Sequence, residues 1–188
     1  MRTHRQLVVY HSILQTLHEA GCPFCRFLKE FQAFRLQNHS ESELRPLCNF
    51  HTWGLAAVQD TPATAEAFMK LVNIAAVASN GSSDCRICRE VEAEEELRLR
   101  EFVNCIECAE VARWLRSDAI LCVPHAMQLR RRVPPGVVPR IDGIIIQCRQ
   151  QLTEELHQLE NEAGPERTGW GAIGRAAEFL VAQRGLRT

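Results

Sequence analysis

The sequence lacks the long apolar runs and the excess of one charge that mark several large classes of protein. No stretch of about 18 consecutive apolar residues occurs, so nothing predicts a membrane-spanning helix or a membrane partner. The first eleven residues carry charge and no continuous apolar segment, so we expect no secretory signal and a cytoplasmic protein. Lys and Arg number 22 against 23 Asp and Glu, which argues against general nucleic-acid coating.

Strand-like alternation of apolar and polar residues is also missing. The longer apolar patterns step by three and four residues, which is the spacing of one face of a helix. We therefore predict an all-α fold, a helical bundle of about seven helices. The predicted helical stretches lie at about 6–19, 23–37, 49 onward, 62–80, 86–115, 124–132, 140–160 and 170–181.

Cysteine and histidine, by contrast, are abundant, with nine and seven residues respectively. A chain of 188 residues can bury a sizeable core without disulfides. In a reducing cytoplasm, repeated cysteine pairs are more often metal ligands than disulfides. The cysteines therefore point to metal binding.

One cysteine pattern occurs twice along the chain. Each copy is a Cys-x-x-Cys pair followed, after 22 or 33 residues, by Leu-Cys-x-x-His. We predict one metal site per copy, with the ligands Cys22, Cys25, Cys48 and His51 in the first and Cys85, Cys88, Cys122 and His125 in the second. Three thiolates and one imidazole form a tetrahedral donor set typical of zinc, so we expect two zinc ions per chain.

The position of the pairs suggests how the ions would act. Each pair falls at a predicted helix start, where backbone amides and the helix dipole favour thiolates. Four protein ligands leave no coordination position open for water or substrate. Both sites are therefore predicted to be structural and to hold helical hairpins together. We expect a single all-helical unit over 1–188, with a first zinc half at about 1–80, a second at about 81–135 and a C-terminal helical region at about 136–188.

The duplicated motif, from Cys22-Pro23-Phe24-Cys25 to Leu121-Cys122-Val123-Pro124-His125, resembles an uncharacterised family of bacterial helical proteins presumed to bind zinc. The resemblance covers roughly residues 10–183. It departs from the family pattern in a shortened first copy and in Arg86, where proline is usual. It implies the fold and the metal and carries no established activity.

The remaining cysteines allow alternatives. Cys105 and Cys108 could replace Cys85 and Cys88 as partners of Cys122 and His125, or form a redox pair, although their helical stripe favours a buried core pair. Cys148 falls on the apolar stripe of the 140–160 helix and is predicted to be core.

The pattern favours a zinc-binding helical protein that acts as an interaction or regulatory scaffold with a protein partner. A nucleic-acid-binding transcriptional regulator is an alternative, with Arg130 to Arg140 as its basic face. A redox-responsive zinc-thiolate switch is another. No catalytic constellation is evident, so an enzyme is not favoured.

Overall fold

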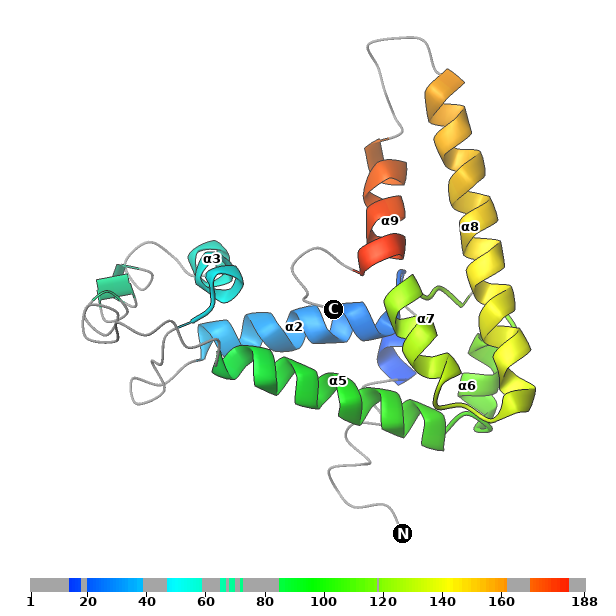
Figure 1. The fold of residues 1–188 in the computed structure, drawn as a ribbon, viewed down its shortest axis with the longest axis horizontal. Coiled ribbons are helices and arrows are strands. Elements are labelled where there is room, and N and C mark those ends of the chain that lie inside the picture. Colours follow the sequence, from blue (N-terminus) through cyan, green and yellow to red (C-terminus); the bar gives the residue numbers. More distant parts are fainter. Residues whose placement is uncertain are drawn as a thin grey trace. The chain divides into compact units, whose positions relative to one another are not determined.

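A computed structural model describes residues 14–17, 20–38, 47–58, 65–66, 68–69, 72, 85–117, 119–161 and 170–182. Every regular element in these ranges is helical, as the spacing of apolar residues predicts (Figure 1). The elements are α2 (Pro23–Gln37), α3 (Asn49–Val58), α5 (Arg86–Asn104), α6 (Ala109–Trp114), α7 (Val123–Arg130), η2 (Pro135–Val137), α8 (Val138–Asn161) and α9 (Trp170–Val181). The helices predicted at 6–19 and 62–80 lie almost entirely outside the described residues. Across the described ranges, no helix combines the length and apolarity needed to cross a membrane.

The helix predicted over 86–115 is two helices. Tight backbone bonds from the Cys105 amide to the Phe102 carbonyl and from the Cys108 amide to the Cys105 carbonyl, at 3.0 and 2.8 Å, end α5 in a turn. Cys108 then takes an extended conformation and begins α6. The turn lets α6 bury Val111 and Trp114. Neither proline nor glycine marks this break, which is why the residue spacing alone predicts one long helix.

The chain divides into two compact units that interleave along the sequence. Unit 1 consists of residues 1–27, 96–186 and 188, and unit 2 of residues 28–95 and 187. Both α2 and α5 contribute residues to both units. The units therefore differ from the consecutive halves, 1–80 and 81–135, that the sequence repeat suggests.

Unit 1 has a continuous apolar core. It is built around Phe24, Phe102 and Trp114, whose rings meet edge to face at centroid distances of 5.3 and 5.8 Å. Residues of α7 and α8 complete the core, among them Leu129 and Ile141, both fully buried. The helices α7, α8 and α9 pack on one another in the same unit.

Unit 2 is smaller and packs α3 against α2. Leu28, Leu36 and Leu55 are each almost completely buried. The helices approach closely at Gly54, where an added Cβ would lie 3.0 Å from the Leu36 side chain. Glycine at this position therefore allows α3 to lie tightly on α2.

Candidate metal centres

Four helices begin with the same local structure. The carbonyl oxygens of Cys22, Cys48, Cys85 and Cys122 each accept a backbone N–H bond from the residue four positions on, at 2.9 to 3.3 Å. These cysteines are thus the residues that cap α2, α3, α5 and α7. The second ligand of each pair lies three positions later, in the first helical turn. Side chains at these two positions both reach the space in front of the helix N-terminus, which explains the two-residue gap in every pair.

One cluster combines the first and the last of the four motif pairs along the sequence and is therefore called the outer cluster. It contains Cys22, Cys25, Cys122 and His125. It lies in unit 1, where the N-termini of α2 and α7 meet. The Nδ1 atom of His125 lies 3.5, 3.4 and 3.0 Å from the Sγ atoms of Cys22, Cys25 and Cys122. The Sγ atoms of Cys25 and Cys122 are 3.5 Å apart.

The second cluster, here called the inner cluster, contains Cys48, His51, Cys85 and Cys88. It lies in unit 2, at the N-termini of α3 and α5. The Nδ1 atom of His51 lies 3.3, 3.4 and 3.4 Å from the three Sγ atoms, and the Sγ atoms of Cys48 and Cys88 are 3.6 Å apart. Zinc at about 2.3 Å from sulfur and about 2.0 Å from nitrogen holds tetrahedral ligands roughly 3.5 to 3.8 Å apart. Both clusters therefore have the size of a tetrahedral metal site.

All eight residues singled out in the sequence lie in these two clusters, but their predicted partition is wrong. The repeat predicts that each copy binds its own ion. The structure instead brings the first pair of copy one to the last pair of copy two, and the two middle pairs to each other. The pairing is nested rather than consecutive. Cys85 and Cys88 lie in the inner cluster, apart from Cys122 and His125.

Charge repulsion within each cluster favours a bound cation. In the inner cluster, burial disfavours the Cys85 thiolate, but hydrogen bonds from His51 and from backbone amides outweigh it and lower the Cys85 pKa to about 6. Burial and the neighbouring thiols Cys48 and Cys85 raise the pKa of Cys88 to about 12. In the outer cluster, hydrogen bonding with Cys22 and Cys25, together with burial, raises the pKa of Cys122. In each cluster, deprotonation of one thiol thus makes deprotonation of the next unfavourable. A bound divalent cation would remove this repulsion between thiolates.

The histidine rings are held by aromatic neighbours from within the motifs themselves. Phe24, between the two cysteines of α2, stacks on His125 at a centroid distance of 5.3 Å and an interplanar angle of 27°. Phe50 meets its neighbour His51 edge to face at 5.2 Å. The Nε2 atom of His51 is buried and makes no hydrogen bond within the described part of the chain. A metal ion bound at Nδ1, which faces three sulfurs, would leave the ring proton on Nε2.

The other three cysteines belong to neither cluster, and none of the nine cysteines forms a disulfide. Cys105 is buried in the unit 1 core, in line with the core prediction. Cys108 is half-buried and caps α6. Cys148 is half-buried at the edge of the core rather than inside it. No cluster of metal-binding side chains in the described ranges includes Cys105 or Cys108.

The arginines considered as a basic face have acidic neighbours. Arg130 forms an ion pair with Asp142 of α8 at 3.0 Å, and Arg132 pairs with Glu96 of α5 at 2.7 Å. Both pairs lie within unit 1 and connect α7 and the turn after it to neighbouring helices. The Arg130 and Arg132 side chains therefore connect helices within the protein.

Comparison with known proteins gives no further assignment: no family model, curated protein or solved structure matches the chain.

Proposed function

We propose that this protein is a zinc-binding helical scaffold in which two zinc ions hold the starts of four helices together in pairs. The observation that carries the proposal is the gathering of eight cysteine and histidine side chains into two closed sets of four. Thiolate sulfur and imidazole nitrogen at tetrahedral spacing suit zinc better than magnesium or calcium, which prefer oxygen ligands. One histidine per set favours zinc over an iron–sulfur cluster, which is usually held by four cysteines.

A structural role fits these sets better than a catalytic one. Catalytic zinc sites have three protein ligands and keep the fourth position for water or substrate. Here four protein ligands surround each centre, and both histidines are almost completely buried. Structural zinc contributes about 10 to 16 kcal/mol of binding free energy at pH 7. This binding free energy equals or exceeds the free energy of unfolding of a typical domain. The packing of each helical pair would therefore require its bound ion.

An interaction role agrees with the apolar residues that remain on the surface. The side chain of Trp53 on α3 is 73% exposed, and Phe34 on α2, in the same unit, is 58% exposed. Tryptophan is enriched at the centres of protein interfaces and costly to leave in water. We infer that a protein partner covers part of unit 2.

Metal analysis of the purified protein tests the zinc proposal. Elemental analysis is expected to give two zinc ions per chain for the wild type and for Cys105→Ser, a buried cysteine outside both clusters. Cys25→Ser is expected to bind one. Cobalt substitution is expected to give the intense visible bands of four-coordinate thiolate sites. A folded, metal-free wild type would falsify the proposal, and five-coordinate cobalt with exchangeable water would replace it with a catalytic site.

A further inference from the structure

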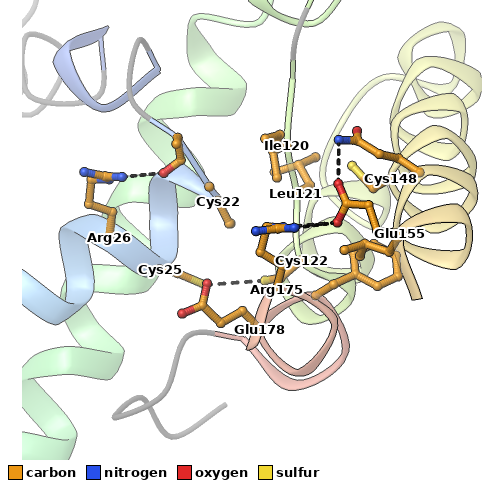
Figure 2. A pocket seen from close by; sticks show the side chains of 15 residues that line it. Cys22, Cys25, Arg26, Ile120, Leu121, Cys122, Cys148, Glu155, Arg175 and Glu178 are labelled. Carbon is orange, nitrogen blue, oxygen red and sulfur yellow. Dashed lines mark hydrogen bonds and ion pairs between the residues drawn. The ribbon is translucent and has the colours of Figure 1, made fainter. Parts of the chain in front are cut away.

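Unit 1 contains a cavity of about 240 Å³ beside the outer cluster. Figure 2 shows it between the start of α2, the segment leading into α7, and the helices α8 and α9. Its lining is mostly apolar, with Leu121, Leu152 and Phe179 among the contributing side chains. Small-molecule sites have this character, with apolar walls and a few polar groups that fix orientation.

Four sulfur-bearing side chains line this one cavity. Three of them, Cys22, Cys25 and Cys122, belong to the outer cluster, and the fourth is Cys148 of α8. Burial raises the pKa of the Cys148 thiol, so it stays neutral and uncharged at neutral pH. Polarisable sulfur makes favourable contacts with aromatic rings, often at the ring edge.

Three of the four charged side chains at the cavity, Arg26, Glu155 and Arg175, are already engaged, and the fourth is the carboxylate Glu178. Arg175 donates from Nε and Nη2 to one oxygen of Glu155, at 3.2 and 2.7 Å, and Gln151 donates to the other oxygen at 3.2 Å. Arg26 donates to the carbonyl of Ala20 (Figure 2). An anionic ligand would have to break the Arg175–Glu155 pair and would meet the Glu178 carboxylate, whereas a neutral hydroxyl or N–H group can add to the pair.

We propose that this cavity binds a small neutral aromatic molecule, with its ring against the cysteine sulfurs and Phe179 and its polar group at the Arg175–Glu155 pair. The size agrees, because an apolar cavity of about 150 Å³ accepts benzene. The remaining volume leaves room for a hydroxyl or a fused ring. The site goes beyond the scaffold role and depends on it only because the metal would hold one cavity wall in place.

Three matched probes test the chemistry on the full zinc-loaded chain. Phenol, cyclohexanol and benzoate share a six-membered ring and differ in aromaticity and charge. Calorimetry or NMR titration is expected to show saturable 1:1 binding of phenol, at least tenfold tighter than either alternative. Equal affinity for cyclohexanol or benzoate, or no saturable phenol binding, would overturn the proposal.

Two tryptophan variants on α8 test the location. Leu152 lines the cavity, and Leu156, one turn further on, does not. Leu152→Trp is expected to weaken phenol binding at least tenfold, while Leu156→Trp retains wild-type affinity. Zinc content is measured in both. Two zinc ions with no phenol binding in the wild type contradict the cavity proposal alone, whereas absence of zinc contradicts the scaffold proposal.

Alkylation of the unmodified chain provides a second readout that does not depend on any variant folding. Cys148 and Cys108 are both half-buried, but only Cys148 lines the cavity. With iodoacetamide and peptide mass spectrometry, saturating phenol is expected to slow modification of Cys148 severalfold and leave Cys108 unchanged. Equal effects on both cysteines, or none on Cys148, would contradict occupancy of the cavity.

Discussion

At the scale of single residues, the second variable position of the Cys-Pro-Phe-Cys motif has a structural role. Phe24 is 3% exposed and stacks on the ring of His125, a candidate metal ligand that follows it by 101 positions. It also meets Phe102 edge to face, at an interplanar angle of 71°. One side chain thus joins the outer cluster to the core of unit 1.

Removing this ring is expected to damage both the core and the metal site. Phe24→Ala should lower the free energy of unfolding by about 3 to 5 kcal/mol, through lost burial and the cavity left behind. It should also speed zinc loss from unit 1. Phe34→Ala, on the same helix but 58% exposed, is the matched control and should cost no more than about 0.5 kcal/mol. Urea unfolding followed by circular dichroism measures both, and equal costs would contradict a packing role for Phe24.

The ligand residues themselves could be predicted from the sequence because their chemistry is local. Each pair occupies a helix cap and the third residue of the first turn, so a two-residue gap and a helix start are sufficient to identify it. Which pairs share an ion is a long-range property, and the repeat suggests the wrong answer. The cavity beside Cys148 depends on side chains from four separated segments and leaves no pattern along the chain.

At the scale of elements, the nested pairing follows from how α2 and α5 run. In unit 1, Phe24 contacts Phe102, and the Arg98 guanidinium lies 3.5 Å from the centroid of the Phe27 ring. The later residue of α2, Phe27, thus contacts the earlier residue of α5, Arg98, so the two helices run antiparallel, as Figure 1 shows. The start of α2 lies beside the end of α5, from which the chain continues to α6 and α7. Cys122 and His125 thus reach Cys22 and Cys25.

Helix length makes the consecutive pairing unfavourable. The 15 residues of α2 span about 22 Å and the 19 residues of α5 about 28 Å, at 1.5 Å per residue. In each of these helices the Cys-x-x-Cys pair lies at the N-terminus, and the chain continues to the next Cys-x-x-His pair from the C-terminus. The bounds of α2 could be predicted from its apolar spacing, but the end of α5 at Asn104 and the mutual direction of the two helices required the tertiary structure.

In unit 2, the same two helices are joined by an ion pair. Arg35 of α2 donates to both oxygens of Glu90 on α5, at 2.8 and 3.1 Å, and Arg86 donates to the same carboxylate at 2.6 Å. Burial would raise the pKa of Glu90, but these hydrogen bonds outweigh it and hold the pKa below its usual value. A carboxylate with a depressed pKa stabilises the folded state above the pKa of the unfolded chain and loses that effect as the pH falls.

Glu90→Gln is therefore expected to cost up to about 1 kcal/mol, since the pair is only partly shielded from water. The cost should be constant between about pH 5.5 and 8, because the unfolded glutamate pKa is about 4.3 and the folded value is lower. It should shrink only below that range. Chemical denaturation of both proteins at several pH values checks this, with Glu154→Gln as a surface control on α8. A cost that changes between pH 6 and 8 would contradict the assignment.

At the scale of the whole molecule, each unit has its own cluster of candidate metal ligands, and the two clusters differ in shielding. The outer cluster is essentially buried, whereas Cys48 and Cys88 of the inner cluster are half-buried. A chelator reaches exposed thiolates more readily than buried ones. The two ions should therefore leave the protein at different rates.

Chelation kinetics are expected to show two phases of equal amplitude, the faster from the inner cluster. Single-site variants assign them: Cys25→Ser should keep only the fast phase, and Cys88→Ser only the slow one. Metal release recorded with a chromogenic chelator, alongside helicity, follows both events. The opposite assignment of the two phases would contradict the difference in shielding.

The nested pairing is tested most directly by the zinc content of two double variants, measured by native mass spectrometry. Cys25→Ser with Cys122→Ser removes two ligands from the outer cluster alone, so nested pairing predicts one bound zinc ion. Cys25→Ser with Cys48→Ser damages both clusters, and nested pairing predicts none. Consecutive pairing of the two motif copies gives the reverse, so one ion retained by the second variant and none by the first would contradict the nested arrangement.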